Sequence, residues 1–100
     1  MVYEIKVGVI KPDKLRTWNE NHEPFDILDN PRDINNIDWT EFLAASQKLF
    51  TEKVTVDWGS FAFKATKDQL KQLAENYNAK IAGLDGLPDE NLGVVFIEMS

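Results

Sequence analysis

The alternation of apolar and polar residues is most regular between residues 38 and 50, where it predicts an amphipathic helix. Asp38 and Glu41 have the spacing of a capping box, and Ile37 stands where it can pack against Phe42 at the helix entry. Helical spacing brings one stripe together, and it contains Trp39, Phe42, Leu43, Ser46, Leu49 and Phe50. Because so broad an apolar stripe needs a flat apolar partner, we expect this helix, Trp39 included, to pack on a sheet.

A second amphipathic helix is predicted from residue 66 onward. Thr66 and Gln69 again have capping-box spacing, and Asn78 suits a left-handed residue at the helix end. The apolar stripe of this helix consists of Leu70, Leu73, Ala74 and Tyr77. Two helices with one apolar side each are expected to lie on the same face of the sheet.

Three stretches have the pattern of β-structure. Residues 2–10 alternate apolar and polar side chains, which indicates a strand with one buried face. Residues 53–65 predict a hairpin with Gly59 and Ser60 as its two-residue loop. That register places three pairs on one face: Val54 with Ala65, Val56 with Phe63 and Trp58 with Phe61. Residues 92–99 are apolar on both faces, which is typical of a strand buried on both sides.

The predicted order is therefore strand, helix, hairpin, helix and strand, in one domain that spans residues 1–100. This is the β-α-β-β-α-β order of ferredoxin-like domains, an α+β fold of two layers with four mainly antiparallel strands and two helices on one face. The likeness concerns the fold alone, because this fold hosts many unrelated functions. The last strand fits poorly, since that topology places it at an edge although both its faces are apolar. We expect either the segment 11–37 or a second copy of the chain to cover it.

Residues 11–37 have the least regular pattern in the chain. Pro12, Pro24 and Pro31 interrupt them and Asn and Asp are frequent, so we expect a long irregular acidic segment that lies over the domain. The chain has a net charge of −6, and the window 20–41 sets one base, Arg32, against Glu20, Glu23, Asp26, Asp29, Asp33, Asp38 and Glu41. Such a surface disfavours nucleic acid and suits a basic protein partner, although a purely solubilising role explains the charge more simply.

Candidate chemistry is sparse in this sequence. His22 is the one histidine, and we interpret it as a surface-loop residue because no partner for acid–base catalysis accompanies it. Asp26, Asp29, Asn30 and Asp33 lack the regular spacing of a calcium loop, so turn and capping roles explain them better. No phosphate loop or nucleophile elbow occurs, and no metal or cofactor is predicted. The lack of Cys and of a long apolar run favours a cytoplasmic protein that does not bind membranes.

We expect a protein-interaction role without catalysis, carried by the acidic surface of residues 20–41. Trp18 and Phe25 are the candidate apolar anchors, because Trp is enriched at binding hot spots. Packing of Trp18 in the core is the alternative, and it is the more common fate of a large aromatic residue. The acidic residues of this predicted site are Glu20, Glu23, Asp26, Asp29 and Asp33. The alternative is a small-molecule-binding protein or enzyme that forms a homodimer, with a pocket between sheet and helices. A third hypothesis, a subunit of a larger assembly, has no residue-level support.

Overall fold

The computed structural model of the protein describes residues 3–56 and 59–98. The strands are β1 (Tyr3–Ile10), β2 (Leu28–Asn35), β3 (Thr51–Thr55), β4 (Phe61–Ala65), β5 (Lys80–Ile81) and β6 (Leu92–Glu98). The α-helices are α1 (Pro12–Arg16), α2 (Trp39–Leu49) and α3 (Lys67–Tyr77), and two short 3-10 turns are η1 (Pro24–Asp26) and η3 (Leu84–Gly86).

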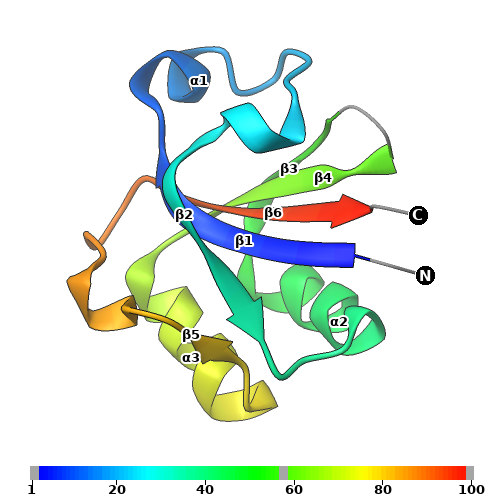
Figure 1. Ribbon diagram of the computed structural model, residues 1–100, viewed down its shortest axis with the longest axis vertical. Helices are drawn as coiled ribbons and strands as arrows, with labels where there is room; N and C mark the ends of the chain where they lie inside the picture. Colours follow the sequence, from blue (N-terminus) through cyan, green and yellow to red (C-terminus); the bar gives the residue numbers. More distant parts are fainter. Residues whose placement is uncertain (1–2, 57–58, 99–100) are drawn as a thin grey trace.

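The described strands form one antiparallel sheet in the order β3-β4-β6-β1-β2-β5. Helices α2 and α3 lie on one side of the sheet, and the segment with α1 and η1 lies on the other (Figure 1). Two apolar clusters follow from this layering, a larger one beneath α2 and α3 and a smaller one beneath residues 11–27. The sheet is thus covered on both faces.

The predicted fold class is right in being α+β and a single domain, and wrong in its details. Four strands and two helices were expected, whereas the described residues form a six-stranded sheet and three α-helices. Strand β2 lies within the segment 11–37, where an irregular connection was predicted. The strand order also differs from the ferredoxin-like prediction, because β6 pairs with both β1 and β4 and so lies inside the sheet.

The interior position of β6 explains why both its faces are apolar. Val94 and Phe96 belong to the larger cluster beneath the helices. Val95 and Ile97 belong to the smaller cluster, together with Trp18 and other residues of the segment 11–37. Of the two covers predicted for this strand, the segment 11–37 is therefore the one that the structure contains.

Strand β2 forms although its sequence, LDNPRDIN, lacks a strand pattern. Its pairing with β1 is interrupted at Gly8, where one residue of β1 faces Asn30 and Pro31 of β2. A β-bulge of this kind accommodates the left-handed Asn30, with a φ of 46°, and the missing N–H of Pro31. Gly8 is required there, because a Cβ at this position would lie 2.7 Å from the Asp29 carbonyl oxygen. The bulge therefore lets a turn-rich sequence join the sheet.

Strands β3 and β4 form the predicted hairpin in a different register. Val54 pairs with Ala62, where Ala65 was expected. The N–H of Val56 donates to the carbonyl oxygen of Ser60 at 2.9 Å, so the loop is longer than the predicted two residues. The ladder is also irregular between Thr51 and Val54.

The change of register also changes which face the β3 side chains occupy. The partner of Val54 shifts by an odd number of residues, and an odd shift turns every side chain of a strand to the other face. Val56 accordingly lies in the smaller cluster with Val54 packed against it, while Phe63 and Ala65 lie in the larger one. The prediction of one shared face was wrong. The predicted pair of Trp58 cannot be assessed, because Trp58 lies outside the described residues.

Both predicted helix starts are confirmed. The Asp38 carboxylate accepts the N–H of Glu41 at 2.9 Å at the start of α2. Thr66 and Gln69 form the reciprocal capping box at the start of α3. The expectation that Trp39 packs in the core is wrong. This residue lies in the first turn of α2, and 38% of its surface is exposed.

Candidate functional site

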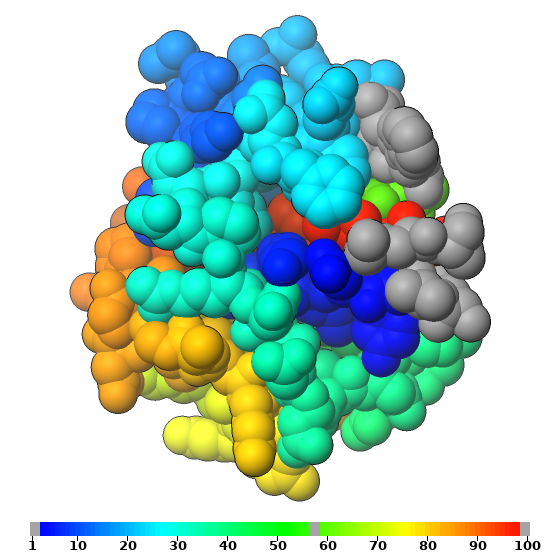
Figure 2. Space-filling view, in the orientation of Figure 1, coloured from blue at the N-terminus to red at the C-terminus, as the bar shows by residue number. Residues whose placement is uncertain are grey.

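Residues 11–27, the 11–27 loop, form a closed excursion between β1 and β2. The N–H of Lys11 donates to the carbonyl oxygen of Ile27 at 3.0 Å, which brings the two ends of the loop together. Figure 2 shows the blue-to-cyan atoms of this loop across the upper part of one face of the molecule. Compact surface loops whose ends adjoin are frequently functional, and we therefore consider this loop the candidate site.

Trp18 fixes the loop to the sheet. Its side chain is only 3% exposed and belongs to the smaller cluster. The indole N–H donates to the carbonyl oxygen of Glu52 on β3 at 2.7 Å, and the Lys64 ammonium lies 5.7 Å from the ring centroid. Trp18 is therefore a structural residue. Of the two roles considered from the sequence, core packing is the one found, and the role of exposed anchor is wrong.

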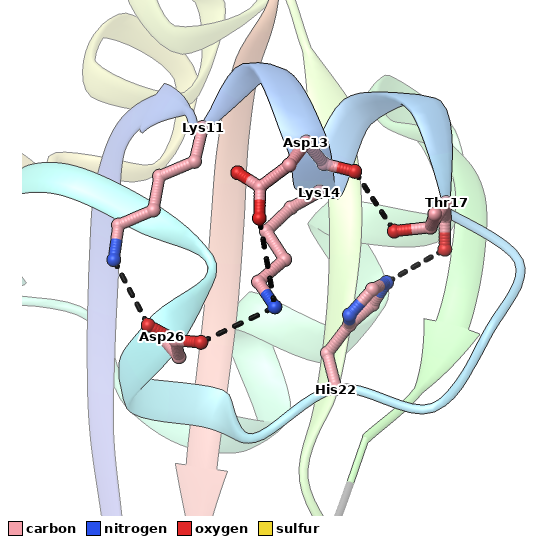
Figure 3. Close-up of polar contacts among 6 residues, drawn as sticks. All are labelled: Lys11, Asp13, Lys14, Thr17, His22 and Asp26. Atoms are coloured by element: carbon pink, nitrogen blue, oxygen red, sulfur yellow. Dashed lines mark hydrogen bonds and ion pairs between the residues drawn. The ribbon is translucent and has the colours of Figure 1, made fainter.

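His22 holds the middle of the loop from inside. The imidazole is 6% exposed, and its Nε2 lies 2.7 Å from the carbonyl oxygen of Thr17. Thr17 in turn donates from its hydroxyl to the carbonyl oxygen of Asp13 at 2.9 Å (Figure 3). The interpretation of His22 as a surface residue was wrong, because the ring is buried and contacts a backbone carbonyl oxygen within the loop.

Two lysines hold η1 in place through Asp26. Figure 3 shows Lys11 and Lys14 reaching the two carboxylate oxygens, at 2.9 Å and 3.2 Å. Hydrogen bonds from Lys11 and then Lys14 hold the pKa of the Asp26 carboxyl below its usual value. The hydrogen bond to Asp26 likewise raises the pKa of Lys11. The loop is thus closed by an ion-pair bridge as well as by backbone and indole hydrogen bonds.

Acid is expected to weaken this bridge. Because the pKa of Asp26 is lowered in the folded state, its contribution to stability is present above the unfolded pKa of about 3.9 and is lost as the pH falls through the folded value. The stability advantage of the wild type over Asp26→Asn should therefore shrink below about pH 4. Urea unfolding of both proteins across this range measures it. Asp89→Asn is the control, because it removes an exposed carboxylate outside the loop. A stability difference between the wild type and Asp26→Asn that stays constant down to about pH 2 would contradict the ion-pair bridge.

Phe25 points away from this rigid framework. It is 66% exposed, whereas the preceding Pro24 is buried and the following Asp26 is held by the two lysines. Phe25 and Trp39 are the large apolar residues that are exposed in the described part of the chain. Glu20 and Glu23 precede Phe25 in the same loop, and both are exposed. The loop therefore exposes one aromatic ring and, earlier in the same loop, two carboxylates.

The predicted acidic surface is divided in the structure. Glu20, Glu23 and Asp26 lie in the 11–27 loop, whereas Asp29 and Asp33 lie on β2. Lys6 of β1 neutralises Asp33 at 2.5 Å, so lysines from outside the window 20–41 offset part of its charge. Sequence reasoning missed these lysines, because Lys11 and Asp26 are 15 residues apart and no local spacing connects them.

Arg32, the one base of the acidic window, forms no ion pair with an acid in residues 3–56 and 59–98. The Arg32 guanidinium donates to the carbonyl oxygens of Ala82, at 3.3 Å, and of Gly83. These contacts attach β2 to the connection that follows β5. Arg32 therefore connects two segments through backbone carbonyl oxygens, and it does not neutralise a carboxylate of the 11–27 loop.

Comparisons with protein-family models, curated proteins and solved structures found no match to this chain. The candidate site is therefore defined by the geometry of the chain itself. No group of three or more His, Cys, Asp or Glu side chains that could hold a metal lies together among the described residues. In the same part of the chain, no helix has the length and apolar character to cross a membrane.

Two of the hollows lined by described residues are open to solvent. One, of about 300 Å³, lies where β1 and β2 separate and is lined by Tyr3, Glu4, Ile5 and residues 33–37. The other, of about 200 Å³, lies between the first turn of α3 and residues 90–92. Ligand pockets are usually enclosed and mostly apolar, with a few convergent polar groups. The first hollow has a mainly polar lining and lies between two strands, so it does not resemble the pocket between sheet and helices expected for a small-molecule-binding protein.

Proposed function

We propose that this protein is a non-enzymatic interaction domain that binds a protein partner through the 11–27 loop, with Phe25 as the apolar anchor. The proposed surface differs from the predicted one in two ways. Asp33 of the window 20–41 is paired with Lys6, and Trp18, the other candidate anchor, is buried. The exposure of Phe25 on an otherwise fixed turn is the observation that carries the proposal.

Burial of the Phe25 ring by a partner would contribute favourable free energy to binding. Full burial of a Phe side chain contributes about 1.5–3 kcal/mol relative to leaving it in water. At 66% exposure, most of that gain is still available to a partner. Aromatic side chains that fill a pocket at the centre of an interface are typical hot spots.

The loop framework also lowers the entropic cost of binding. Flexible loops lose conformational freedom when a partner orders them, and this loss subtracts from affinity. Here the Trp18 indole, the His22 ring and the lysine bridge to Asp26 already fix the backbone on both sides of η1. A partner would therefore order little more than the Phe25 side chain itself.

Phe25→Ala is expected to weaken binding without unfolding the domain. Loss of a hot-spot aromatic costs about 2 kcal/mol or more, which is roughly thirtyfold in the dissociation constant. The unfolding free energy should change by less than about 0.5 kcal/mol, because the ring is mostly exposed. The measurement is affinity capture from native cell extract, followed by titration of the purified captured partner against both proteins.

Trp39→Ala is the matched control for this experiment. Trp39 is the other exposed aromatic residue of the described chain, and it lies on α2 outside the 11–27 loop. A partner that binds through the loop should be retained by Trp39→Ala and lost by Phe25→Ala. Equal retention by both variants would refute the proposed contact.

A further inference from the structure

We infer that the partner has an apolar pocket for Phe25 with lysine or arginine residues opposite Glu20 and Glu23 and no base opposite Asp26. This inference rests on the proposed function and adds the chemistry of the partner surface. It follows from an asymmetry in charge along the 11–27 loop. The carboxylates before Phe25 and the carboxylate after it have different surroundings.

The carboxylate after Phe25 is already neutralised. Asp26 accepts from Lys11 and Lys14, and both lysines are partly shielded from solvent. A basic residue of the partner at this position would meet two ammonium groups that occupy the carboxylate. Like charges placed across an interface are strongly unfavourable.

The carboxylates before Phe25 are in the opposite situation. Glu20 and Glu23 are exposed, and within the described part of the chain no ion pair links either of them to a base. In the proposed complex the partner covers Phe25 and extends along the loop to Glu20 and Glu23, so it removes water from both carboxylates. Burying a carboxylate without a compensating cation is costly, so these two positions select a partner that brings cations to them.

A second copy of the chain is a poor source of such cations. Within its 11–27 loop Lys11 and Lys14 are paired with Asp26, which leaves Arg16 as the remaining base for two carboxylates. Most closed dimers are two-fold symmetric and place the same patch of each subunit against itself. Self-pairing of this loop would bring Glu20 and Glu23 close to their own counterparts, in a chain whose net charge is −6. A distinct, basic protein is therefore the occupant that the charges favour.

The test compares two double variants with the same change in net charge. Glu20→Gln/Glu23→Gln removes the loop carboxylates, and Glu75→Gln/Glu90→Gln removes two exposed carboxylates from α3 and from the connection before β6. The probe is the protein that the wild type captures and Phe25→Ala does not. Its dissociation constant is measured with each variant at about 50 mM and about 500 mM salt, because screening separates charge effects from apolar ones. Sedimentation of the wild type alone measures self-association.

The loop variant is expected to bind about tenfold or more weakly at low salt, with a much smaller difference at high salt. The matched variant should stay within about twofold of the wild type. Equal effects of the two double variants, or a Phe25-dependent dimer of the chain itself, would overturn the basic-partner inference while leaving Phe25 as a contact. If no protein is captured in a Phe25-dependent way, the proposed function itself fails, and the inference falls with it.

Discussion

Replacement of Trp18 by Ala is expected to reduce the free energy of unfolding by about 3–5 kcal/mol, as large aromatic-to-Ala changes in cores do. The indole is buried in the smaller cluster, where Val56, Val95 and Ile97 form the sheet side. Its removal leaves a cavity between loop and sheet and deprives the Glu52 carbonyl oxygen of its donor. Since small domains are stable by only about 5–15 kcal/mol, the loss should be plain in urea unfolding.

Two further variants divide this effect into its parts. Trp18→Phe keeps an aromatic body but loses the indole N–H, and should cost about 1–3 kcal/mol, between wild type and Trp18→Ala. Trp39→Ala removes the same side chain where it is partly exposed, and should cost about 1 kcal/mol or less. If Trp18→Ala and Trp39→Ala lost equal stability, the loop would not be packed on the sheet as described. Amide hydrogen exchange in residues 11–27 then reports whether the loop opens alone or with the domain.

The two long helices could be predicted because their signals are local. Capping residues lie within a few positions of the apolar stripe they precede, as at Thr66 and Gln69 for α3. The burial of β6 was also readable, since apolar residues on both faces indicate cover on both sides. The sequence did not decide whether the segment 11–37 or a second copy of the chain covers β6, because the covering residues are distant from β6 in the chain.

Strand β2 could not be predicted from its own residues. Asn30 and Pro31 are turn formers, and only the bulge opposite Gly8 lets them sit in a ladder with β1. The hairpin register failed for a related reason. Glu52 adopts a left-handed φ of 52° within the irregular part of β3, and the alternation of side chains gives no sign of it. Register depends on such local irregularities as much as on the apolar pattern.

The predicted interaction surface and the proposed one share Phe25 and its neighbours, but the structure shows which aromatic residue of this segment is buried. Trp18 and Phe25 are both aromatic residues in a polar segment, so sequence alone could not separate the buried one from the exposed one. What separates them is the position of the carbonyl oxygen of Glu52, which receives the indole N–H from across the fold. The lysines that neutralise Asp26 and Asp33 are likewise distant in sequence, which is why the acidic window looked more uniform than it is.

Phe42→Ala is expected to have an effect of about 3–5 kcal/mol on the free energy of unfolding, comparable to that of Trp18→Ala. Phe42 is 0% exposed, and its ring lies 5.9 Å from that of Phe96, 6.3 Å from that of Phe63 and 6.5 Å from that of Phe50. One side chain of α2 thus contacts β4, β6 and the C-cap residue of its own helix. Such aromatic pairs add about 0.5–1.5 kcal/mol beyond the area they bury.

Phe25→Ala is the matched control for Phe42→Ala, because the chemical change is identical and only the burial differs. Thermal unfolding should place Phe25→Ala near the wild type and Phe42→Ala well below it, by about 12 °C or more for a domain of this size. A similar loss in both variants would mean that Phe25 is packed and not free for a partner. The same pair of proteins therefore tests the packing of α2 and the availability of the loop anchor.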